Sequence, residues 1–298
     1  MKVLLALTLL TGTCAFTVQR ASYGRNAWLK ASKAPYEWNA DSSDADFDIY
    51  DSLAEDTTEV SFIPSVSTKD KWETLAPFHV QGGSLRTRGF SEDSERIEIF
   101  LKSEGRILNA DIDLWYSPTN VPQKMSVYLE DGNLYPFRCT VESPGKSSTV
   151  AIRNTGTVEF PLSAAVDSET SRESESNNLF QTSSPHLIQG GAVYSTSFPV
   201  EVESVQVLLR TDGRPLNAKV ELLHGPNSIK QVMDLYSEDG DQRTFYFIID
   251  TPGSANVLRI VNTAGQEFPM SAFIEPYIVD TNNIKDSPNA TRKPLVWN

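Results

Sequence analysis

The chain has few of the residues that usually carry metal, redox or nucleophilic chemistry. It contains only 2 cysteines and 3 histidines among 298 residues. No Gly-x-Ser-x-Gly, His-Glu-x-x-His or phosphate-binding glycine loop occurs, and no Cys/His pair has metal-ligand spacing. We therefore expect no catalytic residues, no metal and no cofactor, and we predict that the protein is not an enzyme.

Long hydrophobic runs are also lacking, apart from one at the start. Residues Val3 to Leu10 are mostly apolar and lead to the small-residue ending Thr13-Cys14-Ala15, which is typical of a cleavable signal peptide and too short to span a bilayer. Residues 16–33 contain basic residues and serines but no acidic residue, as in a transit peptide. We predict that residues 1–33 form a signal peptide followed by a plastid transit-like presequence.

Positive charge is scarce in the remainder. The whole chain carries 26 basic and 39 acidic residues, and removal of residues 1–33 leaves 21 basic residues and a formal charge near −18. Such a surface repels nucleic acid and anionic lipid, so we expect neither nucleic-acid binding nor membrane insertion after presequence removal. Because Cys14 leaves with the presequence, only Cys139 remains and no internal disulfide can form.

What the chain does have is a duplication. Gln81-Gly82-Gly83 returns as Gln189-Gly190-Gly191, and the register continues without a gap to Ala164 and Ala272. The second copy follows the first at an offset of 108 residues (189 − 81). Two residues separated by this offset are called repeat equivalents. We assign a structural role within each repeat to Gln81, Gly82, Gly83 and Asn109, and to their equivalents Gln189, Gly190, Gly191 and Asn217. Cys139 aligns with Phe247, which predicts a core position for both.

Apolar residues alternate with a period of two, as in Ile97, Ile99 and Leu101, and turn residues recur about every ten positions. This pattern, present in both copies of the duplication, predicts an all-β fold of two tandem homologous β-sandwich or jelly-roll-like domains. Asp131-Gly132 and Asp239-Gly240 lie between strand-like runs, and we expect each glycine to supply the positive φ of a tight turn.

The predicted organisation follows from these patterns. After the presequence (1–33) come an acidic N-terminal extension (34–76), the first β domain (77–166), a polar linker (167–184), the second β domain (185–275) and a C-terminal docking tail (276–298). The tail ends in a short apolar group with a tryptophan, and Trp38 lies in a similar Trp-Asn context. The candidate assembly residues are therefore Leu295, Val296, Trp297, Asn298 and Trp38.

Two further asparagines, Asn154 and Asn262, precede the two Glu-Phe-Pro motifs. Together with Asn109 and Asn217, they are interpreted as residues that hydrogen-bond to loop backbones, and contact with a sugar or a peptide is the alternative. His79 and His186 stand just before the two Gln-Gly-Gly motifs, which favours structural hydrogen bonds over catalysis.

The ordered set of duplicated motifs resembles the pyrenoid shell proteins of diatoms. Gln-Gly-Gly, Gly-Arg-x-Leu-Asn-Ala, Glu-Asp-Gly and Asn-Thr-x-x-x-Glu-Phe-Pro carry the resemblance over Phe78–Ala165 and Ser184–Glu275. The resemblance implies that the two β domains are related by pseudo-two-fold symmetry. It also implies a homo-oligomer that assembles into an extended sheet or tube. It also implies a shell at the pyrenoid periphery in the chloroplast stroma, whose inner face meets the Rubisco condensate and which supports CO2 concentration and fixation.

A different class of function stays open at this point. The signal peptide alone would permit a secreted or wall-associated pair of β-sandwiches that binds carbohydrate or acts as an adhesive, and Asn289-Ala290-Thr291 would then be a glycosylation site.

Overall fold

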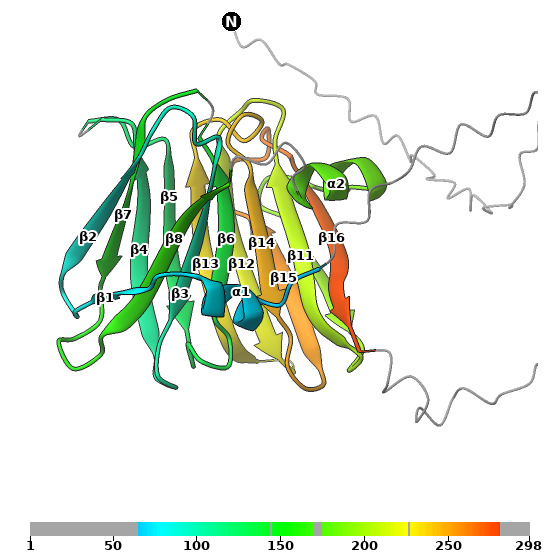
Figure 1. Ribbon diagram of the computed structural model, residues 1–298. Helices are drawn as coiled ribbons and strands as arrows, with labels where there is room; N and C mark the ends of the chain where they lie inside the picture. Colours follow the sequence, from blue (N-terminus) through cyan, green and yellow to red (C-terminus); the bar gives the residue numbers. More distant parts are fainter. Residues whose placement is uncertain (1–64, 118, 144, 170–174, 226, 281–298) are drawn as a thin grey trace, which may run out of the picture. The chain divides into compact units, whose positions relative to one another are not determined.

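A computed structural model describes residues 65–117, 119–143, 145–169, 175–225 and 227–280. All of them belong to the compact unit Val60–Asn298. The fold is an antiparallel β-sandwich of two eight-stranded sheets, which confirms the all-β sandwich predicted from the alternating pattern (Figure 1). One short helix precedes each repeat, and the pattern did not predict these helices. The helices are α1 (Thr68–Thr74) and α2 (Glu175–Thr182).

The first sheet contains, in spatial order, β1 (Phe78–Val80), β8 (Leu162–Glu169), β3 (Arg96–Lys102), β6 (Phe137–Glu142), β14 (Phe245–Asp250), β11 (Val202–Arg210), β16 (Met270–Val279) and β9 (His186–Ile188). The second sheet contains β10 (Val193–Phe198), β15 (Asn256–Asn262), β12 (Leu216–His224), β13 (Ser228–Ser237), β5 (Gln123–Leu129), β4 (Leu108–Trp115), β7 (Ser148–Asn154) and β2 (Leu85–Phe90).

The two repeats share both sheets. Strand β6 of the first repeat pairs with β14 of the second, and β5 pairs with β13, so each sheet runs without interruption from one repeat into the other. If each strand is replaced by its equivalent in the other repeat, each sheet shows the same strand order read from its opposite end. This is the order that a pseudo-two-fold axis between the repeats requires.

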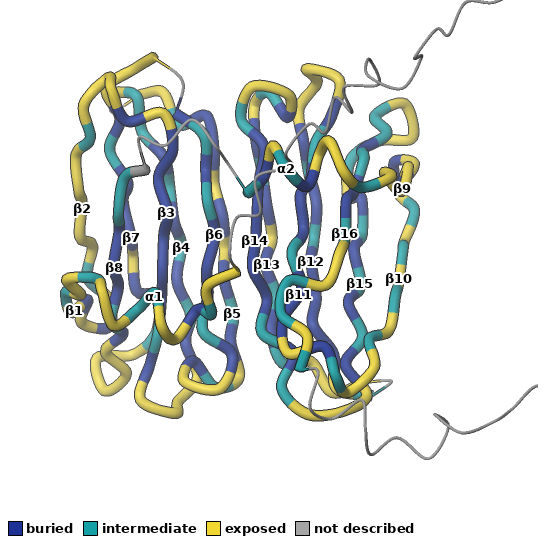
Figure 2. Tube along the Cα trace, turned by 45° about the vertical axis from the view of Figure 1, so that its right-hand side comes forward, coloured by how far each residue is buried: buried dark blue, intermediate teal, exposed yellow. Residues whose placement is uncertain are grey.

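Alternate residues of the strands build the core between the sheets. On β3, Ile97, Ile99 and Leu101 are at most 1% exposed and face the second sheet, whereas Glu98 and Phe100 lie on the opposite face under the helices. Each buried residue of this size contributes about 1.5–3 kcal/mol. Figure 2 shows the buried strands in the middle of both layers and, at opposite ends, the largely exposed β2 and the partly exposed β10.

The segment predicted as a polar linker, residues 167–184, differs in part from that prediction. Asp167–Glu169 complete β8, and Glu175–Thr182 form α2, in which Leu179 is only 2% exposed. The local composition is too polar to fold alone, but Leu179 packs on Leu208 and Phe273 of the first sheet. Tertiary contact therefore orders a segment that local sequence cannot.

The role assigned to the Asp-Gly turns needs a correction. Gly132 and Gly240 are not among the described glycines with positive φ. A Cβ at Gly132 would lie 2.5 Å from the Ser103 Oγ, and one at Gly240 would lie 2.5 Å from the Thr211 Oγ1. These glycines are needed because another chain segment approaches them closely, which a turn pattern does not reveal.

Candidate functional site

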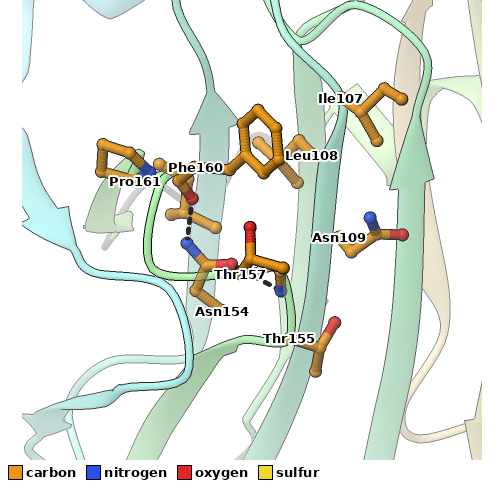
Figure 3. Close-up of a pocket in the computed structure, with 10 residues that line it drawn as sticks. Ile107, Leu108, Asn109, Asn154, Thr155, Thr157, Phe160 and Pro161 are labelled. Atoms are coloured by element: carbon orange, nitrogen blue, oxygen red, sulfur yellow. Dashed lines mark hydrogen bonds between the residues drawn. The ribbon is translucent and has the colours of Figure 1, made fainter.

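A pocket of about 320 Å³ lies where two duplicated motifs meet in the first repeat (Figure 3). Ile107, Leu108 and Asn109 come from the Gly-Arg-x-Leu-Asn-Ala motif at the start of β4, and the loop from Asn154 to Leu162 supplies the other wall. Ile107 is 49% exposed and Phe160 is 38% exposed, so apolar side chains are accessible at this pocket. Its chemistry suits an apolar or aromatic group with a few polar neighbours.

Asn154 holds the loop of this pocket in place. Its Nδ2 donates hydrogen bonds to the backbone oxygens of Val80 (3.0 Å) and Phe160 (2.8 Å), and its Oδ1 accepts one from the Gly156 N–H (2.9 Å). The side chain is 1% exposed, so these bonds satisfy a buried amide.

Asn262 repeats this network in the second repeat. Its Nδ2 donates to the oxygens of Ile188 (3.0 Å) and Phe268 (2.8 Å), and its Oδ1 accepts from the Ala264 N–H (3.0 Å). The interpretation of both asparagines as loop-fixing residues is confirmed. Asn109 and Asn217 act through their backbone oxygens, which accept hydrogen bonds from the Thr155 and Thr263 N–H groups at 3.0 and 3.1 Å.

The Gln-Gly-Gly motifs form the other side of the same loops. A Cβ at Gly82 would lie 1.8 Å from the Thr157 oxygen, and one at Gly190 would lie 1.7 Å from the Gly265 oxygen. Gly83 and Gly191 have φ values of 74° and 78°, which favour glycine. The backbone oxygens of Gln81 and Gln189 accept hydrogen bonds from the N–H groups of Ser84 and Ala192, which directly follow the two motifs.

The duplication extends upstream into the helices, which the sequence analysis missed. Trp72 of α1 and Phe180 of α2 are repeat equivalents, and both lie on the outer face of the first sheet, edge-on to Phe100 and Phe273 respectively. The cationic groups of Lys102 and Arg210, which are also repeat equivalents, lie 6.0 and 4.3 Å from these two rings. The sequence did contain a signal for this, because Trp72 and Phe180 are aromatic residues separated by the offset of the repeat. The residues around them show little identity between the two copies.

The buried Arg138 on β6 contacts β3, the residue Val66 before α1, and the start of α2. The Arg138 Nε lies 2.7 Å from the Glu98 Oε1, its Nη1 donates to the Val66 oxygen at 2.9 Å, and its Nη2 is 3.7 Å from the Glu175 Oε2. Burial alone would lower the pKa of Arg138, but the carboxylates of Glu98 and Glu175 raise it above its ordinary value. The guanidinium therefore stays charged and fastens both helix regions to the sheet.

The second repeat has a neutral pair in the place of this ion pair. Tyr246 and Gln206 occupy the positions equivalent to Arg138 and Glu98, and the Tyr246 hydroxyl donates to the Gln206 Oε1 at 3.1 Å. The outer faces of the two repeats are thus similar in packing but different in charge.

Each end of the sandwich presents open strand edges. Strands β1 and β2 lie at the end formed by the first repeat, and β9 and β10 at the end formed by the second (Figure 2). Within the described residues, each of these four strands pairs with one neighbour only. Unpaired backbone groups at such edges are available to another strand.

The histidines before the Gln-Gly-Gly motifs make structural contacts at these ends. The His79 Nδ1 is 3.2 Å from the Ser163 Oγ, and the His186 Nε2 is 3.1 Å from the Tyr194 hydroxyl, with the two rings stacked at 4.4 Å. The described ranges contain no group of three His, Cys, Asp or Glu residues that could hold a metal ion.

The candidate assembly residues Trp38, Leu295, Val296, Trp297 and Asn298 lie outside the described residues, as does the predicted presequence. In the described part of the chain, no helix is long and apolar enough to cross a membrane.

Taken together, the fold and these contacts define a class of protein: an all-β sandwich built from a repeated unit. The diatom pyrenoid shell protein family matches residues 72–276, and the chain belongs to that family. Membership places the protein in the chloroplast pyrenoid. The resemblance found in the duplicated motifs is confirmed.

A search of curated protein sequences finds no match. Similar solved structures include YhhW from Escherichia coli, with 12% identity and a TM-score of 0.19 over 61% of this chain and 77% of that one. Vicilin from tomato, Solanum lycopersicum, has 10% identity and a TM-score of 0.20 over 66% of this chain and 76% of the other. Oxalate decarboxylase from Bacillus subtilis has 8% identity and a TM-score of 0.17, with 72% of each chain covered. Similarity at this level supports no functional argument.

Proposed function

We propose that this protein is a structural, self-assembling shell protein without catalytic activity. Its copies form a sheet around the Rubisco-containing pyrenoid, at the pyrenoid periphery in the chloroplast stroma, and so support CO2 concentration and fixation. The observation that carries the proposal is the pair of open ends, β1/β2 and β9/β10, at opposite sides of one sandwich. Family membership supplies the biological setting.

The β1/β2 end and the β9/β10 end have equivalent strands but different side chains. Such a pair of ends suits head-to-tail contact between copies. An interface of this kind does not close on itself unless the rotation between copies completes a ring, so it extends into an array. The edge strands also supply the binding energy, because pairing with a neighbour satisfies their free backbone groups. The inner face of such a sheet would meet the Rubisco condensate.

We further propose that the tail Leu295-Val296-Trp297-Asn298 of a neighbouring copy occupies the pocket lined by Ile107 and Phe160. The pocket is apolar at its rim, and a short apolar group ending in tryptophan fits a site of this kind. Trp38 is the corresponding anchor near the other end of the chain. The second repeat carries the same loop framework around Asn262, with Pro215 in the position of Ile107.

Two experiments test the proposed function. The purified chain, residues 34–298, is expected to form sheets or tubes visible by negative-stain electron microscopy, and persistent monomers at high concentration would contradict self-assembly. A fluorescent fusion expressed in a diatom is expected to mark a rim around the pyrenoid. Fluorescence outside the plastid would contradict the proposed location and favour the secreted, adhesive alternative.

A further inference from the structure

The two ends of the sandwich differ in charge, although they occupy equivalent positions in the two repeats. On edge strand β2, Arg86 and Arg88 pair in register with Ile152 and Val150, which belong to the core. Residues paired across antiparallel strands share a face, so both arginines lie on the side of the sheet that faces β1. At the other end, the equivalent residues are Tyr194 and Thr196, and both are uncharged.

A groove of about 490 Å³ lies at the arginine-bearing end. It is lined by Phe78 and His79 of β1 and by Arg86, Thr87 and Arg88 of β2. Both arginines are exposed, and neither forms a hydrogen bond or ion pair with another residue of the described ranges. Two unpaired guanidinium groups, spaced two residues apart on a free strand edge, have the charge and spacing that suit an extended segment with alternating carboxylates. The net charge of the whole chain is −13, so acidic segments are common in it.

The chain itself contains such a segment. Between residues 34 and 64 the sequence carries 9 acidic residues and no basic one. Within it, the run Asp46-Phe47-Asp48-Ile49 alternates acidic and apolar residues with the period of a strand. Such alternation places both carboxylates on one face and both apolar side chains on the other.

We propose that the segment Ala45–Ile49 of one copy adds as an antiparallel strand to the free edge of β2 in a neighbouring copy. In this register Asp48 lies opposite Arg86, Asp46 opposite Arg88, and Ile49 opposite Leu85, which is 36% exposed. Opposite charges directly across a strand pair stabilise it, and the apolar pair covers the outer side. The other end has the uncharged Tyr194 and Thr196 in place of the two arginines, so the acidic segment binds to the end formed by the first repeat.

This inference rests on the proposed self-assembly and names one contact that builds the array. It also assigns a role to the acidic extension: a segment that would otherwise only add repulsion between copies of like charge instead neutralises the cationic end.

Charge reversal tests the contact in the chain of residues 34–298. The variant Arg86→Asp/Arg88→Asp and the variant Asp46→Arg/Asp48→Arg are each expected to raise the concentration needed for assembly by roughly tenfold or more, because two attractive pairs become repulsive. Combining all four substitutions in one chain restores the attraction with its sign reversed, so assembly is expected to return to near the unsubstituted level. Failure of the combined variant to recover, while the unsubstituted chain assembles, would overturn the inference.

Matched controls separate this contact from net charge. Lys69→Asp/Lys124→Asp changes the charge by the same amount on exposed residues away from β2 and its neighbour β7, and Asp41→Arg/Asp44→Arg does so within the acidic extension. Both are expected to alter the assembly concentration much less than the paired variants. If the control variants and the paired variants changed the assembly concentration equally, net charge would explain the result and the inference would be overturned.

Mixed chains show whether the contact joins different copies. One chain carries Phe47→Cys and the other, with a tag of different mass, carries Thr87→Cys. These two positions face each other in the proposed register, so mild oxidation during assembly is expected to yield a disulfide-linked product of mixed mass. Assembly without such a product would overturn the inference while leaving the proposed self-assembly intact. A chain that does not assemble at all would contradict the proposed function itself.

Discussion

Cys139 on β6 lies directly opposite Phe247 on β14, and these two residues occupy the same position in the two repeats. In the other sheet, Ser126 of β5 lies opposite Asp234 of β13, and these are again repeat equivalents. A residue that pairs with its own repeat equivalent lies beside the axis that exchanges the repeats. The axis we infer therefore passes through both sheets at these two pairs.

The Cys139 thiol is predicted to be unreactive in the folded chain. Cys139 is fully buried, and burial, followed by the nearby Glu98, raises the pKa of its thiol well above the ordinary value. In the chain of residues 34–298, where Cys139 is the single cysteine, a thiol-specific chromogenic reagent is expected to label the native protein far more slowly than the denatured protein. Rapid labelling of the native chain would show that the junction between the repeats opens readily.

The two glycines of the Gln-Gly-Gly motif are predicted to respond differently to alanine. Gly82→Ala and Gly190→Ala place a Cβ against a backbone oxygen, so each is expected to destabilise the chain by about 3 kcal/mol or more. Gly83→Ala meets open space but retains a φ of 74°, and should cost about 1 kcal/mol. Chemical denaturation measures all three, and a larger loss for Gly83→Ala than for Gly82→Ala would contradict this assignment.

Replacing the buried ion pair by the pair found in the second repeat is predicted to be tolerated. Arg138→Tyr alone leaves the Glu98 carboxylate buried without its main partner and is expected to cost about 3–5 kcal/mol. Adding Glu98→Gln recreates the neutral pair seen at Tyr246 and Gln206, so most of that loss should be recovered. Additive losses in a double-mutant cycle would instead show that the two sites act independently.

The stability of the chain is predicted to depend on Asp250 between about pH 4 and pH 7. Burial raises the pKa of Asp250 to about 6, although a hydrogen bond from the Thr68 Oγ1 and the charge of Arg138 act in the opposite direction. The folded state then binds this proton more tightly than the unfolded state does. This contribution to stability is therefore present at low pH and is lost as the pH rises through 6.

Asp250→Asn tests this linkage. The variant is expected to unfold with a free energy about 1–3 kcal/mol higher than the unsubstituted chain at pH 8, and with a smaller difference near pH 4. The free energy of unfolding measured by denaturant titration at several pH values checks the sign. A variant that is less stable at pH 8 would show that the ionised carboxylate is stabilising in this position.

Deletion of Lys293–Asn298 is predicted to leave the fold intact and to impair assembly. Ile107→Glu should have the same effect from the other side of the contact, because it places a charge at the rim of the pocket. Val200→Glu, at a residue that is 50% exposed like Ile107 at 49%, is the control. Thermal melting and electron microscopy of the variants separate folding from assembly, and normal sheets from the deleted chain would refute tail docking.

Much of the fold could be predicted from the sequence. The alternation on β3 and β11 identified strands, and the roles of Asn154 and Asn262 followed from their repeated position before Glu-Phe-Pro. The helices could not be predicted in the same way: Trp72 and Phe180 have few apolar neighbours in sequence, and their partners Phe100 and Phe273 lie on distant strands.

The sequence by itself determined the strand period, the duplicated loop framework and the excess of acidic charge, because each depends on local spacing or on composition. Only the tertiary structure decided that the two repeats share both sheets and that Arg86 and Arg88 stand unpaired at one open end. It also decided that Gly132 is required by close approach and not by its φ. These features depend on which strands meet, and that choice is made by packing between residues far apart in the chain.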